Sequence, residues 1–291
     1  MDLRQLEYFV AVAEEGGFTR AAERVHISQS GVSAQIRRLE RELGAELFDR
    51  SARAATLTVA GKAALEHARA ALAAAGAVGQ AVGEVTGLIR GRLAVGMVTG
   101  CTVTPLFEAL AALHRAHPGV ELALLEDGSD RLVRDVREGV LDLALVGAAA
   151  VPEGLESLTI VSERLVAAVP GGHPLAGRRR VALRDLEPYP VVCMPPGTGL
   201  RTVFDRACAA RDAHPVIALQ ASAPDAIADL AERGLGTAIL SESMAAHYAG
   251  RLTALPLDDV PSPGLLLLAW RPAPGPAARA LLAHCRRAFG L

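Results

Sequence analysis

The sequence predicts an α+β protein with more than one domain, and three observations carry that prediction. Residues 1–58 place apolar side chains at helical spacing and end in a short strand pattern. Residues 59–90 form an alanine-rich stretch typical of one long helix. From residue 91 onward, short apolar runs alternate with amphipathic stretches, as expected for a mainly parallel sheet covered by helices. A chain of 291 residues also lies at the size where one hydrophobic core usually divides, about 250 to 300 residues.

Three helices are predicted in the first 43 residues. The first has apolar residues at positions 3, 6, 9, 10 and 12 and ends near a pair of glycines at 16 and 17. The second covers Phe18 to Arg24, and Ser28 is placed to cap a third helix. The buried stripe of the third helix is expected to hold Val32, Ile36, Leu39 and Leu43. A polar loop at 49–55 and a short strand at 56–58 complete this domain.

The other faces of the third predicted helix carry side chains suited to DNA. Gln29, Ser30 and Ser33 are small or amide side chains near its start, which can approach base edges. Arg37 and Arg41 lie further along and can reach phosphates. An ordinary helical hairpin with a solvated, charged face would show the same periodicity. The periodicity alone therefore leaves both interpretations open.

Six short motifs give a more specific indication. They are Leu6-x-x-Phe9, Gly17-Phe18-Thr19-x-Ala21-Ala22, Ser28-Gln29-Ser30-x-Val32-Ser33-x-Gln35-Ile36, Leu39-Glu40-x-x-Leu43-Gly44, Leu47-Phe48-x-Arg50 and Leu57-Thr58-x-x-Gly61. In these motifs the chain resembles the LysR-type transcriptional regulators, bacterial winged helix-turn-helix proteins with a C-terminal effector domain. The match runs nearly without a gap through the first sixty or so residues.

The resemblance implies a DNA-binding surface on this first domain. It assigns contacts with DNA to Thr19, Ser28, Gln29, Ser30, Ser33, Gln35, Arg37, Arg50 and Arg53. Arg37 would serve the phosphate backbone, as would Arg50 and Arg53 from the wing. Ser30 departs from the family pattern, because many members carry proline there. We expect that change to alter the fine sequence preference more than the mode of binding.

Composition excludes several classes of protein. The formal net charge is −2 and Lys62 is the only lysine, so phosphate contacts must come chiefly from arginine and backbone amides. No apolar run reaches the length of about 18 residues that spans a membrane, and no signal peptide is evident, so we expect a cytoplasmic protein without a membrane partner. Four widely spaced cysteines argue against a disulfide framework or a zinc site. A metal shared by His114 and His117 is a weak alternative to two exposed side chains at a helix end, and no cofactor is expected.

The alanine-rich stretch predicts a linker helix from Val59 to about Leu88 that pairs with its copy in another subunit. Two heptad series support a helical seam: Leu65, Leu72 and Gly79 in one, and Ala68, Ala75, Val82 and Ile89 in the other. LysR-type regulators dimerise through such a helix, which strengthens this interpretation. A helix buried within its own chain is the alternative. The four glycines at 76, 79, 83 and 87 depart from an ideal helix, since each lowers helix propensity by about 1 kcal/mol.

Residues 91–291 predict two α/β lobes. In the first, strands at 93–98, 120–125 and 141–146 alternate with helices, and a strand at 161–169 leaves the lobe. In the second, strands at 191–194, 216–219 and 237–240 alternate with helices, before a return strand at 265–270 and a closing helix at 277–289. Two lobes joined by two crossings resemble the periplasmic-binding-protein-like effector domain of the same family. We place lobe I at about 91–162 and 268–291, and lobe II at about 163–267.

Ligands of open parallel sheets bind outside the carboxyl ends of the strands. This rule selects Thr99, Gly100, Cys101, Thr102, Gly147, Thr198, Gly199, Arg201, Ser222 and Ala223 as effector-binding residues. For any single hydroxyl, capping of a helix is the simpler interpretation, but as a group at converging strand ends these residues predict a site. The neutral donors and the one charged residue, Arg201, suggest a small organic anion, unless Arg201 has a structural role.

Cys208 raises the question of redox control, because the peroxide-sensing branch of the family has a reactive cysteine pair on this segment. Cys208 resembles the resolving position, whereas Gly199 stands in the place of the reactive cysteine. A thiol switch of that type is therefore not expected. Cys101 precedes a predicted helix, where a lowered thiol pKa is conceivable, but a small buried thiol is the commoner case.

These observations predict a sequence-specific transcriptional regulator acting as a dimer of dimers on an inverted repeat of double-stranded DNA. An effector bound between the lobes would change their mutual angle and so the spacing of the DNA-binding domains. Contact with RNA polymerase is typical of the family. Two rival classes are a solute-binding protein, opposed by residues 1–58, and an enzyme. No nucleophile elbow, phosphate-binding loop, dinucleotide fingerprint or paired carboxylate motif supports an enzyme, and no catalytic residue is predicted.

Overall fold

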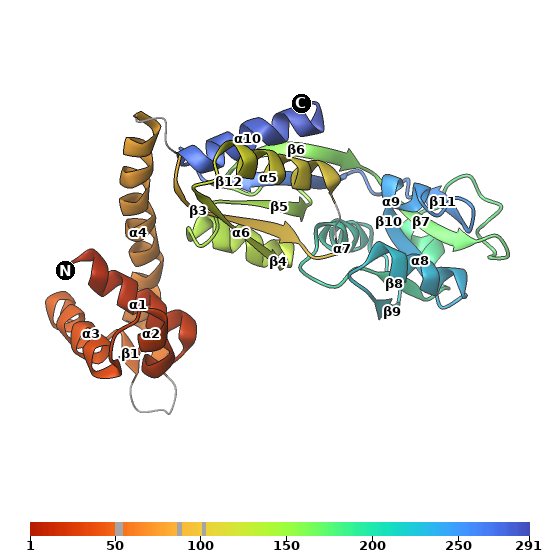
Figure 1. Ribbon diagram of the computed structural model, residues 1–291. Helices are drawn as coiled ribbons and strands as arrows, with labels where there is room; N and C mark the ends of the chain where they lie inside the picture. Colours follow the sequence, from red (N-terminus) through yellow and green to blue (C-terminus); the bar gives the residue numbers. More distant parts are fainter. Residues whose placement is uncertain (50–54, 86–88, 101–102) are drawn as a thin grey trace. The chain divides into compact units, whose positions relative to one another are not determined.

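The computed structural model describes residues 1–49, 55–85, 89–100 and 103–291 (Figure 1). The chain divides into two compact units. The first comprises Met1–Leu88 with Glu138–Val140, and the second comprises Ile89–Arg137 with Leu141–Leu291. Within the described ranges, no helix combines the length and the apolar character that crossing a membrane requires.

Four helices and a small two-stranded sheet build the first unit. The elements are α1 (Leu3–Glu15), α2 (Phe18–Arg24), α3 (Gln29–Leu43), β1 (Phe48–Asp49), β2 (Thr56–Leu57) and α4 (Val59–Val85). These bounds confirm the three predicted helices, the strand after the polar loop and the long helix. Phe48 anchors the core, with its ring edge-on to the rings of Phe9 and Phe18 at centroid distances of 5.5 and 5.7 Å. Such aromatic pairs stabilise a core by about 0.5–1.5 kcal/mol beyond the burial of their area.

Local hydrogen bonds explain where two of these helices begin. The Ser28 hydroxyl accepts from the amide of Gly31 at 3.1 Å, so Ser28 caps α3 as predicted. Thr58 does the same for α4, accepting from the amide of Gly61 at 2.9 Å. A Cβ atom at Gly61 would come within 2.1 Å of the Leu47 carbonyl oxygen. Only glycine therefore lets the start of α4 pack this closely on the preceding segment.

The prediction of a buried stripe on α3 is wrong for its last residue, Leu43. Val32, Ile36 and Leu39 are fully buried, but Leu43 is 45% exposed. Glu40 is buried in its place, and its carboxylate accepts from the amides of Leu47 at 2.9 Å and Phe48 at 3.3 Å. These bonds hold the start of the wing over the Glu40 side of the helix rather than over Leu43.

Helix α4 buries one face against its own unit. Ala68 is buried, and Leu65 and Leu72 pack partly buried against the core formed by the first three helices. The predicted seam through Leu65, Leu72 and Ala68 is therefore occupied within the chain, which corrects the assignment of those residues to a partner helix. Another face of α4 exposes an apolar stripe whose members recur every four or seven residues: Val59, Ala63, Ala70, Ala74 and Val78.

Lobe I of the second unit is a five-stranded sheet in the order β4-β3-β5-β12-β6. Its strands are β3 (Gly91–Val98), β4 (Val120–Asp127), β5 (Leu143–Ala148), β6 (Glu156–Glu163) and β12 (Gly264–Trp270). The first three are parallel, which confirms the predicted β-α-β-α-β order, and β12 runs antiparallel between β5 and β6. Helices α5 (Thr104–Ala116) and α10 (Pro276–Phe289) cover one face, and α6 (Ser129–Arg137) covers the other.

Lobe II has a second five-stranded sheet in the order β11-β7-β10-β8-β9. Its strands are β7 (Leu165–Pro170), β8 (Val191–Cys193), β9 (Ile217–Gln220), β10 (Thr237–Ser241) and β11 (Leu252–Pro256). Helix α7 (Gly199–Arg211) and the 3₁₀ turn η1 (Leu183–Leu186) pack on one face. Helices α8 (Pro224–Glu232) and α9 (Glu242–Ala246) pack on the other.

Two short segments join the lobes. The expected single strand at 161–169 is two strands, β6 and β7, because the chain changes sheet at Arg164. The second crossing lies between β11 and β12, and Gly264 and Leu265 already pair with Glu163 and Ser162 in the first sheet. The predicted end of lobe II at residue 267 is therefore several residues late, since the return strand begins pairing as soon as it reaches lobe I.

Candidate DNA-contacting surface and ligand pocket

The start of α3 presents the polar side chains that the sequence selected. Gln29 and Ser30 are exposed and Ser33 is half-buried. Ser28 is exposed as well, but its hydroxyl already caps the helix and lies 3.1 Å from the Ser30 hydroxyl. Gln29 and Ser30 are therefore the side chains at this turn best placed to meet a base edge.

Charged side chains around this turn differ in how far they are neutralised. Arg24 forms an ion pair with Glu14 at 2.7 Å, and Arg38 forms one with Glu42 at 3.2 Å. Within the described part of the chain, no ion pair engages the exposed guanidinium of Arg37. Arg41 is exposed on the same helix, and within those described residues it likewise forms no ion pair, its Nε donating only to the Arg37 carbonyl at 3.3 Å. Unpaired positive charge on α3 therefore lies at Arg37 and Arg41, where it is available to phosphates.

The remaining predicted contacts with DNA are less uniform. Thr19 is exposed in the first turn of α2, whereas Gln35 is half-buried on α3. Arg50 and Arg53 lie outside the described residues. Thr19, the first turn of α3 and Arg37 are thus all exposed in the described structure, and the wing arginines stay a prediction.

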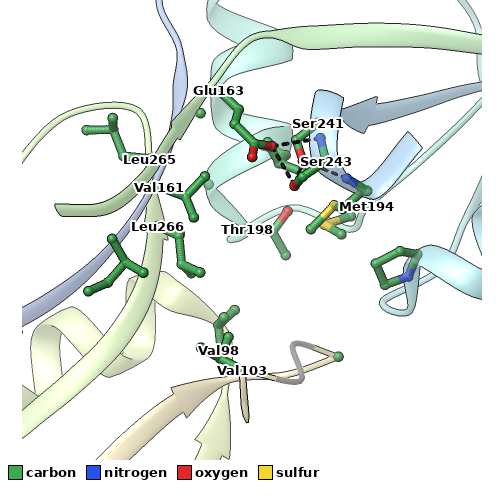
Figure 2. Close-up of a pocket in the computed structure, with 18 of the residues that line it drawn as sticks. Val98, Val103, Val161, Glu163, Met194, Thr198, Ser241, Ser243, Leu265 and Leu266 are labelled. Carbon is green, nitrogen blue, oxygen red and sulfur yellow. Dashed lines mark hydrogen bonds between the residues drawn. The ribbon is translucent and has the colours of Figure 1, made fainter. Parts of the chain in front are cut away.

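A cavity of about 690 Å³ lies between the two lobes of the second unit (Figure 2). Its volume falls in the range of about 300–1,000 Å³ that is usual for small-molecule sites. Five of the residues selected by the strand-end rule line it: Thr99, Gly100, Gly147, Thr198 and Gly199. Cys101 and Thr102 lie outside the described residues. The rule therefore located the cavity from the ends of β3, β5 and β8.

Three of the selected residues do not line the cavity. The Arg201 guanidinium donates to Asp205 at 2.8 Å and to the Met194 carbonyl at 3.3 Å. Its role is structural, because an acceptor one helical turn away satisfies it. Ser222 and Ala223 lie next to Gly100, and the atoms of theirs nearest to it belong to the backbone. The charge on which the predicted organic anion rested is thus held by Asp205 and does not line the cavity.

Glycines set the distance between the lobes beside this cavity. A Cβ atom at Gly199 would come within 2.2 Å of the Gly147 carbonyl carbon. A Cβ atom at Gly100 would come within 2.4 Å of the Ser222 carbonyl oxygen, and Gly100 has a φ of 76°, which favours glycine. The two lobes therefore touch through backbone atoms at both places.

Sequence reasoning missed most of the cavity wall. The additional apolar residues include Val98, Val103, Ile160, Val161, Met194, Leu200, Met244, Leu265, Leu266 and Phe289. The additional polar residues are Thr104, Glu163, Asp225, Ser241, Ser243, His247 and Tyr248. The strand-end rule could have found Ser241, which ends β10 much as Thr99 follows β3, and Ser243, which lies two residues further on in α9. Glu163 ends a crossing strand that pairs antiparallel, so that rule did not apply to it.

Glu163 links the two lobes across the cavity. Its carboxylate accepts from the Ser243 hydroxyl at 2.7 Å and from the Ser243 amide at 3.0 Å (Figure 2). Burial tends to raise the pKa of Glu163, but these bonds and one from Ser241 outweigh it and hold the pKa below its ordinary value. Glu163 is therefore a charged acceptor at neutral pH, fixed at the point where the chain leaves lobe I.

A second carboxylate stands on the lobe II side. The Tyr248 hydroxyl donates to Asp225 at 2.6 Å. Burial and the neighbouring Asp225 raise the pKa of Tyr248 to about 12, so the phenol keeps its proton at neutral pH. His247 lines the same wall, and its Nδ1 lies 2.7 Å from the Ser243 carbonyl oxygen.

The described cysteines are buried free thiols. Desolvation raises the pKa of Cys193, and it raises the pKa values of Cys208 and Cys285 to about 11. A thiol reacts through its thiolate, so these three are chemically quiet at neutral pH. Cys101 lies outside the described residues.

Comparisons with known proteins agree with this arrangement. The family described as "Bacterial regulatory helix-turn-helix protein, lysR family" matches residues 3–62, and "LysR substrate binding domain" matches residues 86–290. The HTH-type transcriptional regulator YnfL of Escherichia coli (strain K12) is 34% identical over 294 residues, covering 99% of each chain.

Solved structures show the same likeness. A cysteine-to-aspartate variant of full-length OxyR from Pseudomonas aeruginosa has a TM-score of 0.74 at 26% identity, covering 100% of this chain and 95% of that one. Full-length CbnR complexed with its target DNA has a TM-score of 0.57 at 26% identity, covering 99% and 100%. The chain belongs to the LysR family: it is a DNA-binding transcriptional regulator, not an enzyme, with an N-terminal helix-turn-helix domain and a C-terminal effector-binding domain.

Proposed function

We propose that this regulator binds an inverted repeat as a dimer of dimers, with α3 of each paired domain in a major groove. The exposed first turn of α3 supports this: within the described ranges the Gln29 side chain makes no hydrogen bond, and the Ser30 side chain makes one, with Ser28. Ser28, Ser33, Gln35 and Thr19 would contact DNA around them. Arg37 would bind a phosphate, with Arg50 and Arg53 contributing from the wing.

The apolar stripe on α4 supports the proposed dimer. Val59 and Val78 are 88% and 66% exposed on a face that the unit itself does not cover. Two such helices side by side would bury both stripes. Contact with RNA polymerase in the bacterial cytoplasm would follow for an activator.

The cavity between the lobes is the proposed effector site. Thr99, Gly100, Gly147, Thr198 and Gly199 would contact the effector there, together with the unpredicted residues of the wall. Cys101 and Thr102 would extend that site from outside the described residues. Because the lobes meet through backbone atoms beside the cavity, a bound molecule would change their angle and pass the change to the DNA-binding domains.

Binding to promoter DNA at several salt concentrations tests the DNA contacts. Gln29→Ala should reduce discrimination between bases at one position by about 1–3 kcal/mol. Arg37→Ala should weaken binding to all sequences and lower the salt slope by about 0.9. Arg206→Ala, which removes an exposed arginine of the effector domain, serves as the charge-matched control and should leave both quantities unchanged. An unchanged salt slope in Arg37→Ala would remove Arg37 from the interface.

A further inference from the structure

Three hydroxyl groups around the cavity have already used their protons within the protein. Thr198 donates to the Pro195 carbonyl at 2.9 Å, Ser243 donates to Glu163, and Tyr248 donates to Asp225. Each hydroxyl has a single proton, so these three oxygens can only accept further hydrogen bonds. This part of the wall therefore offers acceptors to a ligand and needs donors from it.

The Glu163 carboxylate adds a charged acceptor to the same side. A carboxylate has about four acceptor positions, and Ser243 and Ser241 fill about three of them. Both bonds from Ser243 end on one oxygen, Oε2. Capacity to accept a hydrogen bond from a ligand thus remains on a group that already lines the cavity.

Positive charge on the wall is weaker than this negative charge. Helices α5, α7 and α8 begin at the cavity without a side-chain cap, and each helix start is equivalent to about half a positive charge. Glu163 and Asp225 carry a full negative charge each, and Asp225 lies in the first turn of α8. Among the described lining residues there is neither lysine nor arginine, and the Arg201 guanidinium is held by Asp205. Two whole charges therefore outweigh the helix dipoles.

The rest of the wall is apolar. Val161 and Leu266, paired on β6 and β12, face Met194 from the other lobe across the cavity (Figure 2). Such walls accept a hydrocarbon or aromatic body and gain from excluding water.

We propose that the effector is an apolar molecule bearing an amine, whose N–H donors bind the Glu163 carboxylate while its body packs on the wall from β6 and β12. This inference rests on the proposed role of the cavity as the effector site. An ammonium group has three donors and no acceptor, so it complements the Glu163 carboxylate and the three hydroxyls beside it that can only accept.

Three probes with one indole body separate the possibilities: tryptamine, the neutral alcohol tryptophol and the anion indole-3-acetate. Their affinities are measured by calorimetry on the full chain at pH 8, where an imidazole is neutral. We expect tryptamine to bind at least tenfold more tightly than indole-3-acetate. Glu163→Gln keeps an oxygen that accepts from Ser243 but loses the charge, so it should weaken tryptamine at least tenfold and change tryptophol less than threefold.

Two further variants guard against a purely structural effect. Asp225→Asn should weaken tryptamine in the same direction, and Glu121→Gln, an exposed carboxyl on β4 outside the cavity, should not. Equal or tighter binding of indole-3-acetate, no effect of Glu163→Gln on tryptamine, or no binding of any probe at millimolar concentration would overturn the proposal. Promoter binding by the wild type is measured alongside. If an anionic probe binds and changes DNA binding, the proposal that the cavity is the effector site is supported, and only the proposal of an amine effector is rejected.

Discussion

Position 199 shows how one missing methyl group sets the distance between two lobes. The Gly199 backbone lies against Gly147 and Ala148, where a Cβ atom would meet main-chain atoms at 2.2 and 2.3 Å. Main-chain atoms cannot rotate aside as a side chain can. Glycine at position 199 therefore permits the close contact between α7 and β5.

Replacing Gly199 with alanine is expected to destabilise the effector domain by about 1–3 kcal/mol, the usual cost of overpacking. Thermal or urea unfolding of the full chain measures the change. Gly172→Ala is the matched control, because a Cβ atom there would have no described neighbour within 4 Å. Equal free energies of unfolding for the two variants would show that the lobes move apart to accommodate the added methyl group without destabilising the domain.

Asp142 carries a charge that the fold tolerates poorly. Burial raises its pKa, although the Ala94 amide donates to it at 2.8 Å and Arg271 and Arg92 lie near enough to oppose the shift. A folded-state pKa above the ordinary value of 3.8 means that this group favours folding most below that pH. That contribution is lost as the pH rises through the folded-state pKa.

Asp142→Asn keeps an oxygen that accepts from Ala94 and removes the charge. We expect the free energy of unfolding of the variant minus that of wild type to increase as the pH rises from 3.5 to about 6. At pH 7 this difference should be positive, so that the variant is the more stable protein. Urea unfolding across this range measures the difference, with Asp130→Asn, an exposed position on α6, as the control. A variant less stable than wild type at pH 7 would mean that the two arginines more than compensate burial.

At the scale of elements, α4 has two apolar faces with different partners. The face with Ala68, Leu65 and Leu72 packs on its own unit, and the face with Ala70 and Ala74 is exposed. A heptad pattern read from sequence does not distinguish these faces, since both recur every seven residues.

Ala74→Glu is expected to weaken dimerisation at least tenfold, because a charge would be buried between paired helices. Ala74→Ser changes the same position without a charge and should dimerise nearly as wild type. Sedimentation at micromolar concentration distinguishes these outcomes. If Ala74→Glu remains a dimer, the exposed stripe is not the interface.

Periodicity predicted the helices and parallel strands because the spacing of apolar residues within each element reflects which of its faces is buried. Contacts between distant residues were not predictable in the same way. Glu40 is buried in place of Leu43 because it binds two amides of the wing, and Arg201 does not line the cavity but is held by Asp205. Glu163 and Ser243 are 80 residues apart, and nothing in either local pattern indicates that they meet.

For the whole molecule, the buried thiols predict a regulator that does not respond to peroxide. In a Cys101→Ser background, the three remaining cysteines should react with a thiol reagent at pH 7.5 only after unfolding, since their raised pKa values suppress the thiolate. Millimolar peroxide should leave promoter binding by that variant unchanged. A fast-reacting thiol in the folded variant, or a peroxide-induced disulfide, would contradict this.

The position of β12 in the first sheet has a consequence for synthesis on the ribosome. Among the described strands, β6 pairs only with β12, and β12 ends at Trp270, near the end of the chain. Lobe II, encoded in the middle, holds all five of its strands before β12 emerges. The nascent chain can therefore complete its second lobe while the first still has an open edge, so translation that stops before residue 264 would release a protein with β6 unpaired and prone to associate with other strands.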